Sequence, residues 1–272
     1  MTAKALVLCA CGLALVGCGN KENSAQTIVA HPAGGSALQA GTGGGRPIGQ
    51  EEVPIAGRRR YVAFESRAAN LTADDTNGVT DVFVYDNETK QTVRASISSS
   101  GVQGNGGSFS PALTPDGRVV VFESLATNLA PEDTNRHRDI FAHDRKTGLT
   151  TRVSVDSRGN QANNFSQAPH LSADGRYIVF ESLASNLVSD DTNGVIDVFV
   201  HDRQAGRTSR VSVGHDGIQG NNASVSPTIS EDGRYVTFES FATNLLAGKP
   251  EQAKQVFVYD LKTGVLQRVA AG

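Results

Sequence analysis

Residues 116–124 read DGRVVVFES, a tight-turn tripeptide followed by four apolar residues and a Glu-Ser pair. The closing Phe-Glu-Ser recurs at one constant spacing with no insertion or deletion, at 64–66, 122–124, 180–182 and 238–240. A long fixed period is typical of solenoids, propellers and other repeat arrays. The four repeats cover about 51–107, 108–165, 166–223 and 224–272. We therefore take residues 51–272 as one repeat domain.

Within one repeat the pattern predicts β-strands and no helix. In the second repeat the extended segments are short, rich in Val and Phe, and bounded by Gly and Asp. They cover 110–114, 118–124, 139–144 and 149–155. Four antiparallel strands form one blade of a β-propeller, and the apolar run 119–122 suits a strand buried on both faces between neighbouring blades. We predict an all-β propeller of four 58-residue, four-stranded blades.

The repeats also share three short motifs. They are a Ser-x-x-Pro approach at 108–111, the Asp-Gly-Arg turn at 116–118 and an Asp-x-Phe-Val-x-Asp strand at 81–86. On these motifs the chain resembles the TolB-like, WD40-like (PD40) repeat family of bacterial envelope propellers, over about residues 46–272. The resemblance implies a propeller that acts as an interaction platform in the periplasm. The first repeat departs from the pattern, because Arg58-Arg59-Arg60 replaces Asp-Gly-Arg and no clear opening strand precedes it.

Four blades are the low end of the range for propellers. Two arrangements follow from that number. Either the blades form a compact ring that closes alone, or they form an open arc that a second copy of the chain closes. Uncovered sheet edges invite pairing with other chains, so we expect one of the two closures. The second would make the protein a homodimer.

Residues 1–18 indicate export. Lys4 supplies a positive start, and residues 5–17 are apolar, over a length that is typical of a signal peptide and too short to span a bilayer. The sequence Leu15-Val16-Gly17-Cys18 resembles the lipobox of bacterial lipoproteins. The resemblance implies that residues 1–17 are a lipoprotein signal peptide and that Cys18 carries the lipid. An ordinary signal peptide that happens to contain cysteines is the alternative.

Residues 18–50 are predicted to be the lipidated cysteine followed by a flexible linker. The segment is rich in Gly, Ser, Ala, Gln and Asn, and such chains behave as flexible coils. Two or more acyl chains give a stable membrane anchor, so we expect a lipoprotein of the bacterial cell envelope. No Asp follows Cys18 directly. By analogy with enterobacterial sorting, this favours the outer membrane, facing the periplasm, over the inner membrane.

Composition argues against two other kinds of protein. The chain has 25 basic and 28 acidic residues and a net charge of −3, so it lacks the basic excess typical of nucleic-acid binding. No apolar run reaches the length of about 20 residues that a transmembrane helix needs. We therefore expect an envelope protein or a glycan as the partner, and no nucleic acid.

Two long connections recur in each repeat, on the side of the disc opposite the Asp-Gly-Arg turns. The first covers 67–80 and the second about 98–109, and connections of this length are usually functional or disordered. We predict that this side is the binding face, with recurring amides on it. They are Asn70, Asn128, Asn186, Asn244, Gln103, Asn105, Gln161, Asn163, Gln219 and Asn221. The alternative is that these loops cap the blades and hydrogen-bond to one another.

One constellation in the first long loop resembles a calcium loop. Acidic and amide oxygens alternate around a sharp bend, as oxygen ligands of Ca²⁺ do. The candidate ligands are Asp75, Asn77, Asp81, Asp133, Asn135, Asp139, Asp191, Asn193 and Asp197. However, Asp and Asn also shape turns through hydrogen bonds from side chain to backbone. Both interpretations stay open at this point, and no other cofactor is expected.

Repeated charged residues are predicted to join the blades. An active site is normally single, whereas one glutamate and one arginine recur in all four repeats. They are Glu65, Glu123, Glu181 and Glu239, and Arg94, Arg152, Arg210 and Arg268. We predict a non-catalytic binding platform. The alternative is a carbohydrate-active enzyme, a hydrolase or lyase that uses a carboxylate pair, for which Glu132 and Glu231 are the loop candidates.

Overall fold

The computed structural model describes residues 24–30, 37–44, 59–214, 217–247 and 253–269. Among these residues, no helix has the length and apolar character needed to cross a membrane. The predicted signal peptide, residues 1–17, and Cys18 lie outside the described residues. Signal cleavage and lipidation therefore stay predictions.

Repeats two to four each fold into one four-stranded antiparallel sheet. Sheet 2 contains β6 (Ser108–Leu113), β7 (Val119–Ser124), β8 (Asp139–Asp144) and β9 (Leu149–Arg152). Sheet 3 contains β10 (Ser166–Leu171), β11 (Tyr177–Ser182), β12 (Asp197–Asp202) and β13 (Arg207–Arg210). Sheet 4 contains β14 (Ser224–Ile229), β15 (Tyr235–Ser240), β16 (Gln255–Asp260) and β17 (Val265–Arg268). The strands are short because Gly and Asp turns interrupt each apolar run.

Sheet 1 is built differently at its inner edge. Its strands β3 (Tyr61–Ser66), β4 (Asp81–Asp86) and β5 (Gln91–Arg94) match the last three strands of the other sheets. In place of an antiparallel first strand, β2 (Ala37–Gly44) pairs in parallel with β3, and β1 (Ser24–Ala30) pairs with β2.

These two strands correct part of the linker prediction for residues 18–50. The segment contains β1 and β2, so it is not a flexible coil throughout. The physical reason is the free edge of β3, whose unpaired backbone N–H and C=O groups bind another extended segment. Amino-acid composition does not reveal such an edge.

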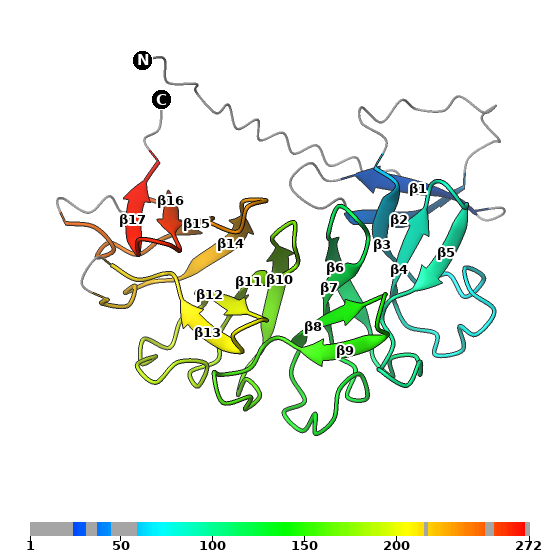
Figure 1. Cartoon of the computed structure of the whole chain (residues 1–272), viewed down its shortest axis with the longest axis horizontal. Helices are drawn as coiled ribbons and strands as arrows, with labels where there is room; N and C mark the ends of the chain where they lie inside the picture. The colour runs from blue at the N-terminus through cyan, green and yellow to red at the C-terminus, as the bar shows by residue number, and fades with distance from the viewer. Residues whose placement is uncertain (1–23, 31–36, 45–58, 215–216, 248–252, 270–272) are drawn as a thin grey trace, which may run out of the picture.

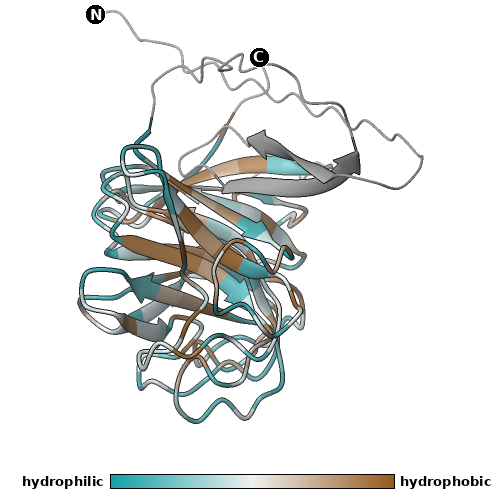
Figure 2. Ribbon diagram, turned by 90° about the vertical axis from the view of Figure 1, so that its right-hand side faces the viewer, coloured by the Kyte–Doolittle hydropathy of each residue, from teal (hydrophilic) through white to brown (hydrophobic). Residues whose placement is uncertain are grey.

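The four sheets follow one another along an arc, with sheet 1 and sheet 4 at its two ends (Figure 1). Three apolar clusters lie between successive sheets, at the 1–2, 2–3 and 3–4 junctions. Figure 2 shows the hydrophobic residues concentrated in the strands, while the connections are more hydrophilic. The prediction of an all-β propeller with four blades is confirmed, and the first blade is the one that departs from the predicted four-stranded form.

The arc is open among the described residues. No apolar cluster of the described chain joins sheet 4 to sheet 1. All residues of β7 and β8 in sheet 2 are buried, whereas in β16 of sheet 4 only Phe257 is. The described residues therefore form an open arc, and closure by a second copy stays a prediction.

Candidate binding surface

In sheets 1 to 3, a glutamate near the end of β3, β7 or β11 binds the sheet that follows. Glu123 on β7 accepts a hydrogen bond from the backbone N–H of Ala168 on β10, at 3.0 Å. Ala168 has a φ of 53° and lies in a bulge of β10. The bulge turns this N–H out of its own ladder and toward the glutamate. The equivalent pairs are Glu65 with Ser110 N, at 2.6 Å, and Glu181 with Ser226 N.

The fourth glutamate has no following sheet to bind within the described chain. Glu239 forms an ion pair with Lys254 of its own sheet at 2.9 Å, and its side chain is 31% exposed. The side chain of Glu123 is 6% exposed. These contacts give the repeated glutamates the joining role that the sequence predicts.

An arginine–aspartate pair braces each sheet from within. Arg118, of the Asp-Gly-Arg turn, donates from Nε and Nη2 to the carboxylate of Asp144, with 2.8 Å to the nearer oxygen. The same pair recurs as Arg176–Asp202, Arg234–Asp260 and Arg60–Asp86. Arg60 thus takes the role of the turn arginine in the first repeat, although the Asp-Gly-Arg motif is absent there. These hydrogen bonds lower the pKa of Asp86 and Asp260 to about 2.

Each candidate calcium loop holds an arginine among its carboxylates. Arg152 lies 3.2 Å from Asp133 and 3.6 Å from Asp139, with side-chain exposures of 9%, 2% and 0%. Burial raises the pKa of both carboxyls, and the arginine charge opposes that shift. In the first repeat Arg94 contacts Asp74, Asp75 and Asp81. In the third repeat Arg210 contacts Asp190, Asp191 and Asp197.

The asparagine of each loop acts as a hydrogen-bond donor toward the carboxylate. Asn135 Nδ2 donates to Asp139 at 2.8 Å and to Ala162 O at 2.9 Å, while its Oδ1 accepts from His137 N. Asn77 and Asn193 are arranged in the same way. Ca²⁺ takes six to eight oxygen ligands. An amide N–H and a guanidinium inside the cluster do not fit that requirement, so the geometry favours the turn interpretation.

The recurring amides connect the long loops of one repeat to those of the next. Asn128 Oδ1 accepts from Asn105 N, and Asn128 Nδ2 donates to Gln103 O, both at 2.9 Å. Asn105 Oδ1 in turn accepts from Thr127 N at 2.7 Å. The same contacts recur for Gln161, Asn163 and Asn186, and for Gln219, Asn221 and Asn244. The amides are thus brought together and bind one another, as the alternative interpretation of these loops expects, and the binding face stays a prediction.

Asn70 is the exception among these amides. It lies in the first repeat, where the described chain has no preceding long loop to face it, and its side chain makes no hydrogen bond within the described residues. Its three equivalents each hold a neighbouring loop. The difference shows that this amide position is used for joining repeats.

Exposed apolar side chains lie among these polar loops. Val102 and Leu125 are about half exposed, and Ile218 and Phe241 occupy the same repeat positions two repeats further on. Leu125 and Phe241 directly follow β7 and β15, and Val102 and Ile218 lie within the long connections β5–β6 and β13–β14. The long-loop side therefore presents a polar surface with apolar side chains set into it, held in place by the amide contacts.

The two candidate catalytic carboxylates do not form a pair. Glu132 lies in the connection between β7 and β8, and Glu231 lies in the turn between β14 and β15. Because the strands are antiparallel, this connection and this turn lie at opposite ends of the strands. Both residues are exposed.

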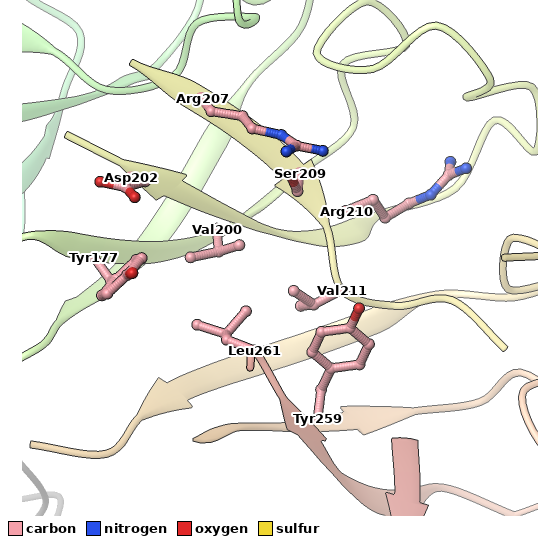
Figure 3. A pocket seen from close by; sticks show the side chains of 9 residues that line it. All are labelled: Tyr177, Val200, Asp202, Arg207, Ser209, Arg210, Val211, Tyr259 and Leu261. Carbon is pink, nitrogen blue, oxygen red and sulfur yellow. The ribbon is translucent and has the colours of Figure 1, made fainter. Parts of the chain in front are cut away.

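A cleft of about 320 Å³ opens between sheet 3 and sheet 4. Tyr177 and Val200 line it from sheet 3, and Tyr259 and Leu261 line it from sheet 4 (Figure 3). Asp202 and Arg207 lie at its margins. The sequence alone did not indicate this cleft. An alignment of the repeats could have indicated it, because the residue that follows the Asp-x-Phe-x-x-Asp strand is an arginine in sheets 2 and 3 and Leu261 in sheet 4.

Comparisons with known proteins return distant structural likenesses. No protein-family model and no curated protein matches the chain. Among solved structures, the putative TolB from Agrobacterium tumefaciens is similar with 13% identity and a TM-score of 0.46, over 77% of this chain and 63% of that one. The acylaminoacyl peptidase from Pyrococcus horikoshii has 11% identity and a TM-score of 0.42, over 78% and 31%. The chain spans less than two thirds of either structure.

Proposed function

We propose that this chain is a non-catalytic binding platform of the bacterial cell envelope, anchored to a membrane through a lipid on Cys18. The observation that carries the binding role is the amide network between the long loops. It holds loops from successive repeats as one rigid surface, and a preorganised surface loses little entropy when it binds a partner. The apolar side chains of Val102, Leu125, Ile218 and Phe241 supply contacts of the kind found in protein interfaces.

The anchoring is supported by the lipobox-like sequence that ends at Cys18, and the partner we propose is an envelope protein or a glycan. The test uses the full chain and a Cys18→Ser variant. Metabolic labelling with a fatty acid is expected to mark the wild-type chain and not the variant. Label on the variant, or none on either, would overturn the anchor.

Binding is tested by capture from solubilised envelope, with the Cys18→Ser chain as bait. The control bait carries Leu125→Lys and Phe241→Lys on the same surface. One protein or one polysaccharide that is retained by the first bait and lost from the second supports the platform. Equal recovery by both baits contradicts the assignment of the long-loop side. Degradation of a captured polysaccharide would favour the enzyme instead.

A further inference from the structure

One position distinguishes the 3–4 junction from the other two. The first residue after the third strand is Arg145 in sheet 2 and Arg203 in sheet 3, but Leu261 in sheet 4. The backbone is placed alike in all three, because this residue donates its N–H to the carbonyl of the turn arginine of its own sheet at 2.8–2.9 Å. The side chain is therefore what differs.

At the first two junctions the arginine side chain enters the space between sheets. Arg145 Nη1 donates to Gly117 O at 2.6 Å, and its guanidinium lies 5.1 Å from the ring centroid of Tyr61 on sheet 1. Arg203 Nη1 donates to Gly175 O at 2.9 Å. Both guanidiniums thus satisfy a turn carbonyl next to the preceding sheet.

At the 3–4 junction the tyrosine ring and the turn carbonyl are present, but no arginine follows the third strand to contact them. Tyr177 is the counterpart of Tyr61, and its ring lies so close to Gly233 that a Cβ there would be 2.7 Å from Tyr177 Cδ2. Gly233 O is the counterpart of Gly117 O, and no residue of the described chain donates to it. Leu261 has no side-chain group that donates a hydrogen bond, and the 320 Å³ cleft lies beside it and Tyr177 (Figure 3).

We propose that the cleft between sheets 3 and 4 binds a guanidinium group from outside the chain, in the place that Arg145 and Arg203 fill at the other junctions. The Tyr61 ring has two guanidiniums over it, those of Arg60 and Arg145, whereas within the described chain Tyr177 has only the first of these contacts, with Arg176 at 4.7 Å. The ring can therefore offer a second cation–π contact, which favours a cation over a neutral group. The Gly233 carbonyl accepts a hydrogen bond. Asp202 at the margin is already compensated by its pair with Arg176 at 2.7 Å, so the ring and the carbonyl carry the recognition.

Two arginines line the cleft and oppose such a ligand, but the charge of Arg210 is compensated by its ion pairs with Asp190, Asp191 and Asp197. Arg207 lines the rim, is exposed, and has Gln91, Leu149 and Val265 as its counterparts in the other sheets. Because it is exposed to solvent, its repulsion is screened by salt. Arg207→Gln is therefore expected to tighten binding of a guanidinium ligand, about twofold at 0.15 M salt.

The test measures calorimetric binding of an acetylated and amidated Gly-Arg-Gly peptide to the full chain. The same peptide with citrulline, a neutral isostere of arginine, is the ligand control. We expect one site for the arginine peptide and binding of the citrulline peptide weaker by about fivefold or more. Equal affinity for both peptides, or no binding of the arginine peptide, would overturn the proposal.

Two substitutions exchange the residue that follows the third strand between sheets 3 and 4. Leu261→Arg supplies the guanidinium from within and is expected to abolish binding, whereas Arg203→Leu opens an equivalent cleft between sheets 2 and 3 and is expected to raise the number of sites from one to two. Unchanged binding in Leu261→Arg contradicts the site. If that variant does not fold, Tyr177→Val replaces it, because Val119 occupies this position in sheet 2. It is expected to weaken binding about threefold.

Agmatine, a small guanidinium compound without a peptide backbone, distinguishes the source of the ligand. Binding of the peptide alone indicates an arginine side chain on a partner protein, and binding of agmatine with similar affinity indicates a small molecule. Failure of both overturns the cleft site but leaves the long-loop platform untouched, since the platform is tested on other residues.

Discussion

Sheet 2 and sheet 4 follow the same repeat pattern, yet of these two only sheet 2 is covered on both faces by residues that the structure describes. Contacts within a sheet are the same in both, as the pairs Arg118–Asp144 and Arg234–Asp260 show, each at 2.8 Å. Contacts between sheets differ. Glu123 binds the next sheet, whereas Glu239 binds a lysine of its own sheet. The comparison separates the stabilising contacts that a repeat forms within itself from those that it forms with the next repeat.

The largest difference between the two sheets is expected at the glutamates. Glu123→Ala leaves Ala168 N without its buried acceptor and removes the partner of Arg138, which should cost about 2–3 kcal/mol of unfolding free energy. Glu239→Ala removes an exposed ion pair and should cost less than about 1 kcal/mol. Urea unfolding followed by circular dichroism measures both. Equal costs would contradict a joining role for Glu123.

A matched valine pair sharpens the comparison through packing alone. Val84, fully buried at the 1–2 junction, and Val258, on the uncovered face of sheet 4, occupy the same repeat position. Val84→Ala should lower the unfolding free energy by about 2 kcal/mol and Val258→Ala by about 0.5 kcal/mol. The same urea experiment checks both. A large cost for Val258→Ala would mean that the free face of sheet 4 is covered in solution, for example by a second copy.

Within-sheet pairs are expected to show no difference between the sheets. Arg118→Gln and Arg234→Gln should have small and equal effects, because neither pair needs a neighbouring sheet. The pKa of Asp260 lies near 2, below its usual value in an unfolded chain, so its stabilising effect is complete above about pH 4 and is lost as the pH falls toward 2. An NMR titration should place this pKa near 2 in the wild type and near 4 in Arg234→Gln. A pKa unmoved by the substitution would refute the pairing.

The addition of calcium is expected to leave the melting temperature unchanged, which is the smallest effect predicted. Because Arg94, Arg152 and Arg210 already lie among the loop carboxylates, 5 mM Ca²⁺ should change Tm by less than about 1 °C. Differential scanning fluorimetry with EDTA as the reference checks this. A rise of several degrees that disappears in Asp75→Ala, Asp191→Ala would restore the metal interpretation.

Much of the fold was predictable from periodicity. The run 119–122 and its repeats specify strands buried on both faces, and the 58-residue spacing specifies four sheets, of which the last three have the same four-stranded form. The position of β2 was not predictable, because the edge of β3 accepts any extended backbone and leaves no side-chain pattern. The arc also depends on how successive sheets pack, in clusters that join residues far apart in sequence.

The candidate site was predictable only in its composition. Asn105 and Asn128 were placed correctly on the long-loop side, but their hydrogen bonds to each other depend on which repeat lies beside which. The guanidinium inside each acidic loop comes from the last strand of its sheet, well beyond the aspartates in sequence, so local spacing suggested calcium. Leu261 could not be identified from its own position, because apolar residues commonly follow β-strands. Its replacement of an arginine becomes visible only when it is aligned with Arg145 and Arg203.

The glutamate contacts give the arc a direction. Repeats two to four each offer a carboxylate on one side and a bulged N–H on the other, the first repeat offers the carboxylate, and the same kind of pair joins sheets 1 to 2, 2 to 3 and 3 to 4. Such a head-to-tail rule lets a gene gain or lose a whole 58-residue unit by duplication or deletion without redesigning any junction. A whole 58-residue unit keeps the carboxylate and the bulged N–H in register with its neighbours, whereas a shift of one residue within a unit would displace the contacts of that unit.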